Sequence, residues 1–81
     1  MTIRLKLFAI AKQLVGSDTI DFELKDGATI AELRETLLQR VPNLSPMRDT
    51  LRFAVNSEYA DDDTKIRESD ELACIPPVSG G

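Results

Sequence analysis

The 81-residue chain is 42% apolar and 30% charged, which predicts one small folded domain without room for a second domain or a deep catalytic cleft. Its net charge of −4 argues against nucleic acid as the main partner, because phosphate binding requires a clustered basic face. The absence of histidine excludes imidazole metal sites and histidine-dependent nucleophilic catalysis.

The single cysteine, Cys74, excludes an internal disulfide and a [2Fe–2S] cluster. The sequence contains no glycine-rich phosphate loop and no apolar run long enough to span a membrane. We therefore expect no metal, no cofactor bound by this chain and no membrane partner, and we take the cytoplasm as the expected location.

The first third of the chain reads as strand, short helix, strand. Residues 3–7 alternate between apolar and polar, which is the period of a strand with one apolar face. Residues 8–15 cluster their apolar side chains as in one or two helical turns, which Gly16 ends. Residues 20–24 alternate again and predict a second strand, followed by a turn at Asp26-Gly27.

The clearest helix spans residues 29–41. Thr29 with Glu32 fits a capping box, and Pro42 ends the helix. The apolar side chains fall on one stripe that consists of Ile30, Leu33, Leu37, Leu38 and Val41. We expect residues 43–50 to be a loop.

Three short strands complete the chain. We place them at residues 51–55, 59–60 and 71–75. The acidic run 61–63 lies in a polar loop and lacks the ligand spacing and closing glutamate of a calcium loop, so we interpret it as solvated.

This order of elements predicts an α+β fold, in which a mixed four- to five-stranded sheet packs on one main helix plus a short helix. The arrangement is the β-grasp, or ubiquitin-like, fold, in which the first and last strands lie side by side. We expect residues 1–75 to form the domain and residues 76–81 to form a flexible Pro-Pro-Val-Ser-Gly-Gly carboxyl tail.

Alternation along the strands predicts two different faces of the sheet. The face toward the helix receives Ile3, Leu5, Leu7, Ile20, Phe22, Leu24, Phe53, Val55, Leu72 and Cys74. The outer face mixes apolar groups with cations and receives Arg4, Lys6, Phe8, Arg52, Ala54, Ala73 and Ile75, which Tyr59 joins. The pattern fits an ordinary half-solvated sheet and a docking patch beside the tail equally well. We expect Cys74 to be a buried packing residue rather than a reactive thiol.

The tail has two parts with opposite properties. Pro76 and Pro77 fix φ and remove backbone donors, so the last strand cannot continue. Gly80 and Gly81 form a thin tip that can enter a narrow slot, because neither has a side chain. We therefore expect the α-carboxylate of Gly81 to be the functional group.

A free carboxylate must be activated before it can react, since its leaving group would otherwise be oxide. The simplest activation is a mixed anhydride with AMP, and an ATP-binding partner must make it because this chain has no nucleotide site. If a sulfur nucleophile then replaces AMP, Gly81 ends as a thiocarboxylate, which is itself a good sulfur nucleophile.

The sequence resembles, over essentially all of its length, the small subunits of molybdopterin synthase, which are MoaD-like sulfur carriers. The resemblance rests on Phe8-Ala9, Leu14-Val15-Gly16, the helix after Thr29, Ala54-Val55-Asn56, Ser69-Asp70-Glu71 and Pro76-Pro77-Val78-Ser79-Gly80-Gly81. The last of these segments is the most specific.

The resemblance implies a role in molybdenum cofactor biosynthesis. Gly81 would carry the acyl-adenylate and then the thiocarboxylate, and Gly80 would give the tail access to narrow sites. The implied partners are an ATP-using, ubiquitin-activating-like adenylyltransferase, a sulfur donor such as a cysteine desulfurase or rhodanese, and the large synthase subunit. That subunit would hold the catalytic side chains, form a heterotetramer with this chain and receive sulfur for a cyclic pyranopterin. The partner interface would consist of Phe8, Tyr59, Ile75, Pro76, Pro77 and Val78.

Three alternatives remain open at this point. The carrier could serve thiamine, cysteine or tRNA thiolation, which uses the same chemistry in another pathway. The chain could be a ubiquitin-like modifier that is conjugated to lysines, or a noncovalent interaction module with an inert tail.

Overall fold

The first strand follows directly from the alternation of apolar residues. In the computed structural model, which describes residues 1–77, β1 (Thr2–Leu7) buries its odd-numbered side chains and exposes the even-numbered ones. The chain then forms α1 (Ala9–Val15). Gly16 ends this helix in the left-handed conformation, with φ of 80°, and donates its N–H to the Lys12 carbonyl at 2.8 Å.

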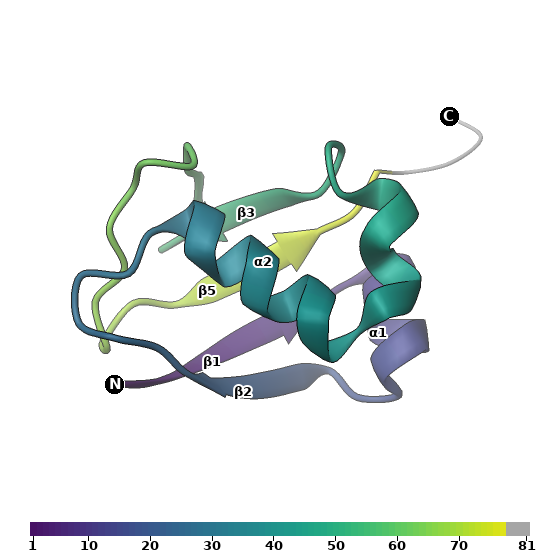
Figure 1. Cartoon of the computed structure of the whole chain (residues 1–81), viewed down its shortest axis with the longest axis horizontal. Helices are drawn as coiled ribbons and strands as arrows, with labels where there is room; N and C mark the ends of the chain where they lie inside the picture. Colours follow the sequence, from purple (N-terminus) through teal and green to yellow (C-terminus); the bar gives the residue numbers. More distant parts are fainter. Residues whose placement is uncertain (78–81) are drawn as a thin grey trace.

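The long helix begins and ends where the sequence predicts. β2 (Thr19–Glu23) returns antiparallel to β1 and leads to α2 (Ile30–Arg40). The hydroxyl of Thr29 accepts a hydrogen bond from the Glu32 N–H at 3.4 Å, as expected of a capping box. Figure 1 shows α2 lying across the sheet, and its buried residues are Ile30, Leu33, Leu37 and Leu38.

The loop predicted for residues 43–50 is wrong in its first half. Residues Pro42–Met47 form a 3₁₀ helix, η1, in which Leu44 is fully buried and donates its N–H to the Val41 carbonyl at 3.0 Å. Proline fixes φ at a value compatible with a helical turn, so Pro42 and Pro46 favour this short helix instead of preventing it.

Three strands complete a five-stranded sheet with the order β2-β1-β5-β3-β4. They are β3 (Arg52–Val55), β4 (Glu58–Tyr59) and β5 (Leu72–Ile75), and each lies within one residue of its predicted start or end. β5 runs parallel to β1 and antiparallel to β3, which confirms the predicted β-grasp arrangement of first and last strands (Figure 1).

The core contains residues that the alternation pattern did not assign. Leu44 and Ile66 are buried although each comes from a segment predicted to be loop or left unassigned, and Ala28 is buried just before α2. The Ile66 N–H donates to the Ala28 carbonyl at 2.8 Å, so backbone pairing holds this lone apolar residue against the core. Conversely, Ile20, Leu24 and Val55 are only half buried, because they lie toward the rim of the core.

Candidate functional site

The chain leaves the sheet from its centre. β5 lies between β1 and β3, and its last residue, Ile75, pairs with Arg52 of β3. Pro76, the first residue of the predicted tail, is buried, and Pro77 is exposed. The chain therefore starts outward from an anchored residue whose φ is fixed by its ring. The predicted site residues Val78, Gly80 and Gly81 lie outside the described residues.

A groove of about 470 Å³ opens beside this exit. Its lining consists of Asp49, Thr50, Arg52, Tyr59, Ile75, Pro76 and Pro77. Four of these, Tyr59 and the run from Ile75 to Pro77, are predicted partner-binding residues, and the structure brings them together. We call this feature the tail-root groove.

Phe8 lies on the other side of Ile75 from the groove. The parallel register pairs Leu7 with Cys74, which places the next residues, Phe8 and Ile75, beside each other on the outer face. Phe8 is 47% exposed and lines a separate hollow with Lys6 and Lys12. The sheet thus presents two apolar positions that flank the root of the tail.

The backbone after Phe8 explains why this aromatic ring stays on the outer face. Phe8 continues the extended conformation of β1, with φ of −129° and ψ of 158°. The turn into α1 is made at the next residue, Ala9, which has φ of 53°. This left-handed conformation costs a residue with a Cβ roughly 1–2 kcal/mol. Because the turn is compressed into one strained residue, Phe8 keeps the orientation of a strand residue.

Two arginines on the outer face of the sheet have different interaction partners. Arg4 donates from Nε to the Asp21 carboxylate at 2.9 Å, and this hydrogen bond lowers the pKa of Asp21 below its usual value. Arg52 instead lies over the ring of Tyr59, with its guanidinium carbon 5.4 Å from the ring centroid. Tyr59 is 64% exposed, so this pair forms part of the accessible wall of the tail-root groove.

Three of the seven residues that line the groove were not predicted as site residues. Asp49 and Thr50 come from the segment between η1 and β3, which alternation cannot place because it is neither strand nor regular helix. Arg52 was assigned to the outer face but not to a site. Ala54, also assigned to the outer face, is only 7% exposed because it pairs between Ala73 and Tyr59 and is smaller than the groups around it.

Cys74 is the only thiol in the chain, and it does not reach the groove. It is fully buried on the helix-facing side of β5. Burial raises the pKa of its thiol to about 12, and the positive charge of Arg34 opposes the shift only in part. The thiol is therefore protonated at neutral pH and inaccessible, which confirms a packing role.

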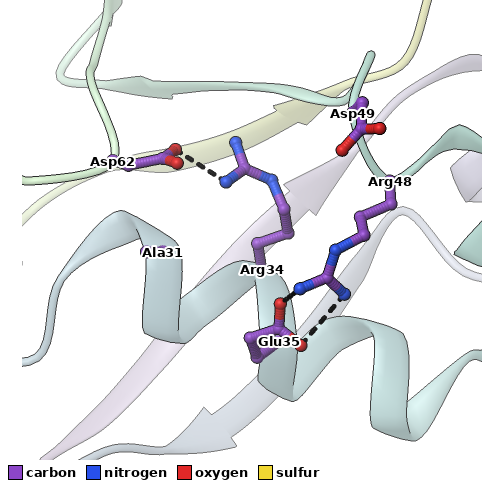
Figure 2. Close-up of a pocket in the computed structure, with 6 residues that line it drawn as sticks. All are labelled: Ala31, Arg34, Glu35, Arg48, Asp49 and Asp62. Atoms are coloured by element: carbon purple, nitrogen blue, oxygen red, sulfur yellow. Dashed lines mark hydrogen bonds and ion pairs between the residues drawn. The ribbon is translucent and has the colours of Figure 1, made fainter.

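A second hollow, of about 430 Å³, is polar and lies beside α2. Figure 2 shows that its charged side chains largely pair with each other: Arg34 reaches Asp62 at 2.6 Å, and Arg48 pairs with Glu35. Arg34 also lies 5.3 Å above the Phe53 ring. These pairs connect α2 to the acidic loop and to the segment after η1, so we interpret the hollow as a structural contact.

Residues 1–77 contain no group of three or more His, Cys, Asp or Glu side chains arranged to hold a metal ion. Over the same residues, no helix is both long and apolar enough to cross a membrane.

Known proteins are similar to this chain along nearly all of its length. The ThiS family matches residues 5–81. A molybdopterin synthase sulfur carrier subunit of Dictyostelium discoideum is 41% identical over 81 residues, covering 96% of this chain and 94% of the relative. The protein of the same name from Chlamydomonas reinhardtii is 36% identical over 83 residues, with both chains covered completely.

Solved structures show the same fold. SAMP1 from Haloferax volcanii is 30% identical with a TM-score of 0.85, and each chain covers 100% of the other. A chain in the complex of subunits 1 and 2 of a molybdopterin-converting factor from Helicobacter pylori has a TM-score of 0.68 at 23% identity, with 100% of each chain covered, which shows the fold alone. The chain therefore belongs to the ThiS family and, within it, to the molybdopterin synthase sulfur carrier subunits.

Proposed function

We propose that this chain carries sulfur on the α-carboxylate of Gly81 and delivers it within a molybdopterin synthase. The observation that carries the proposal is the full-length match to sulfur carrier subunits, since the family match runs through residue 81 and includes the Pro-Pro-Val-Ser-Gly-Gly segment. The domain supports it with an anchored exit at Pro76 and a groove beside that exit.

The loading reaction needs two steps, both on a partner enzyme. The carboxylate of Gly81 attacks the α-phosphorus of ATP, and pyrophosphate leaves, which gives the acyl-adenylate. A sulfur nucleophile at the oxidation level of sulfide then attacks the acyl carbon and expels AMP, which leaves the thiocarboxylate. If the donor is a persulfide, a thiol must in addition reduce the acyl disulfide that forms.

Delivery uses the thiocarboxylate as the nucleophile. Its sulfur attacks an oxygen-bearing carbon of a cyclic pyranopterin held by the large subunit, a carbon–sulfur bond forms, and the carbon–oxygen bond breaks with the oxygen leaving in protonated form. After the acyl carbon–sulfur bond is broken by water, sulfur stays on the pyranopterin and Gly81 is a carboxylate again. The absence of a β-carbon at Gly80 and Gly81 keeps the acyl carbon accessible in a narrow site.

Loading can be tested separately from delivery. The adenylating partner, purified from the same organism, should catalyse ATP–pyrophosphate exchange that depends on this chain. Deleting Gly81 should abolish the exchange, while the thermal unfolding of the domain, which we predict to span residues 1–75, should be unchanged. Full exchange with the deleted chain would contradict the proposal.

Docking of the large subunit is expected on the outer face. The H. pylori complex of subunits 1 and 2 supports a large-subunit partner of this type. Replacing Phe8 with Asp should weaken binding by about 100-fold, because a charge would replace an exposed apolar anchor next to the tail root. Leu14→Asp is the matched control, since Leu14 is also an exposed apolar residue, 37% accessible, but lies on α1. Equal affinities for the two variants would contradict this location.

A second candidate function is protein modification. Its support is the similarity to SAMP1, which is also named small archaeal modifier protein 1 in a second structure from Haloferax volcanii with a TM-score of 0.82. The same acyl-adenylate would then be attacked by a lysine amine, and an isopeptide bond would form. Isopeptide-linked products that disappear when Gly81 is deleted would support this function.

A further inference from the structure

Arg52 of the tail-root groove stacks on an aromatic ring but has no acidic partner among the described residues. Its guanidinium lies 5.4 Å from the centroid of the Tyr59 ring, so one face of the planar cation is covered by an aromatic ring. Among the residues that the structure describes, no carboxylate forms an ion pair with Arg52, and none of its side-chain N–H groups donates a hydrogen bond. None of the described residues therefore occupies the edge of the guanidinium, which carries its donors.

Another arginine of the chain, Arg34, has both an aromatic ring and a carboxylate as partners. Arg34 also lies over an aromatic ring, that of Phe53, at 5.3 Å, and its edge is occupied by the Asp62 carboxylate at 2.6 Å (Figure 2). The Arg34 side chain is 17% exposed and serves contacts inside the domain. Arg52 has the ring without the carboxylate, and it is exposed.

The position of Arg52 connects this open cation to the proposed function. Arg52 pairs with Ile75, the last strand residue before the tail, and lines the same groove as Pro76 and Pro77. A group that binds Arg52 therefore contacts the protein at the point from which the tail departs. The apolar residues on either side, Ile75 and Tyr59, favour a protein surface over a small free anion.

We propose that Arg52, held in place by the ring of Tyr59, is a specificity-determining residue that binds an acidic side chain of the large subunit. This inference rests on the proposed function. A carboxylate pairs with the guanidinium of an arginine through two parallel hydrogen bonds. Neither the ammonium of a lysine nor the neutral amide of a glutamine in place of Arg52 can form the same pair. The partner surface is thus an apolar one with a carboxylate placed opposite Arg52.

Asp49 restricts how the partner approaches. It lines the same groove but forms no ion pair with Arg52. A partner carboxylate close to Asp49 would be repelled, so the acidic side chain approaches the edge of Arg52 at a position away from Asp49. An N–H or a cation of the partner fits opposite Asp49, and the two contacts together fix the orientation of the partner relative to the tail.

The test is the affinity of the full chain for the large subunit of the same organism, measured by titration calorimetry at low and high salt. Arg52→Gln should lower the affinity by about 10- to 100-fold, and Arg52→Lys should restore only part of it. Tyr59→Ala removes the ring that holds Arg52 and should lower the affinity in the same direction as Arg52→Gln. Arg40→Gln is the matched control, because Arg40 is an exposed arginine 5.1 Å above the Phe22 ring and does not line the groove.

A charge-reversal experiment identifies the occupant. Arg52→Glu should bind more weakly than Arg52→Gln, and one acidic-to-lysine substitution in the large subunit should restore binding to Arg52→Glu selectively. Failure of every acidic-to-lysine substitution to restore binding would overturn the inference.

Two further outcomes separate the inference from the function on which it rests. If Arg52→Gln binds like wild type while Phe8→Asp does not bind, the inference is overturned and the proposed docking face stands. If the Arg52→Gln effect vanishes when residues 78–81 are deleted, Arg52 serves the chain's own tail and the inference is also overturned. Absence of binding by the wild-type chain would contradict the proposed function itself.

Discussion

Replacing Leu44 with Ala tests the least expected part of the fold. Leu44 lies in η1 between two prolines, in a stretch that its sequence marks as loop, and yet its side chain is fully buried in the core. The substitution removes three buried carbons and leaves a cavity. If residues 43–50 were a surface loop, the substitution would have almost no effect on stability.

The expected loss can be worked from burial. Three buried carbon groups correspond to about 2.4 kcal/mol of transfer free energy, and buried Leu→Ala substitutions cost about 2–5 kcal/mol once the cavity is included. A domain of this size has a total unfolding free energy of roughly 4–12 kcal/mol. The variant should therefore lose a large share of the stability, and a loss of about 3 kcal/mol would lower Tm by roughly 12–24 °C.

The assay is urea unfolding followed by far-UV circular dichroism. Leu14→Ala is the matched control, because it makes the same chemical change at a residue that is 37% exposed, and it should cost less than about 1 kcal/mol. A Leu44→Ala variant as stable as Leu14→Ala would refute the placement of η1 against the core.

Three other predictions concern the backbone and the buried thiol. Ser57→Gly should stabilise the domain by about 1 kcal/mol in urea unfolding, because Ser57 has φ of 72° in the β3–β4 turn, where glycine is not strained. Gly16→Ala should destabilise it by about 1 kcal/mol in the same assay, since Gly16 has φ of 80°; equal stability in either case would contradict the turn geometry. The pKa of Cys74 is raised by burial from 9.0 to about 12, so only the unfolded thiol ionises in that range and stability should fall between pH 9 and 12, by up to about 1.4 kcal/mol per pH unit. The fall should be smaller in Cys74→Ala, and identical pH profiles would contradict the burial of the thiol.

The regular elements could be predicted because their periodicities are strong. The alternation of residues 3–7 and the apolar stripe of α2 each commit a segment to one buried face, and the Thr29 capping box fixes where the helix begins. η1 could not be predicted, because a single buried residue such as Leu44 has no period. Ile66 was missed for the same reason, since its burial depends on pairing with Ala28 across the fold.

The same distinction between regular elements and tertiary packing separates the residues of the candidate site that could be predicted from those that could not. Ile75, Pro76 and Tyr59 could be placed near the tail root because they lie in or directly after predicted strands. Asp49 and the stacking of Arg52 on Tyr59 depend on how the segment after η1 meets the sheet edge, which local sequence does not encode. The strain at Ala9 is likewise a consequence of tertiary packing, because alanine has no local preference for φ of 53°.

The most direct test of the central claim is the intact mass of the protein isolated from its native host under non-reducing conditions. The account predicts a species in which one carboxyl oxygen is replaced by sulfur, and predicts that this species is lost when Gly81 is deleted. Only the free carboxylate, found even after incubation with the adenylating partner, ATP and a sulfur donor, would contradict sulfur carriage.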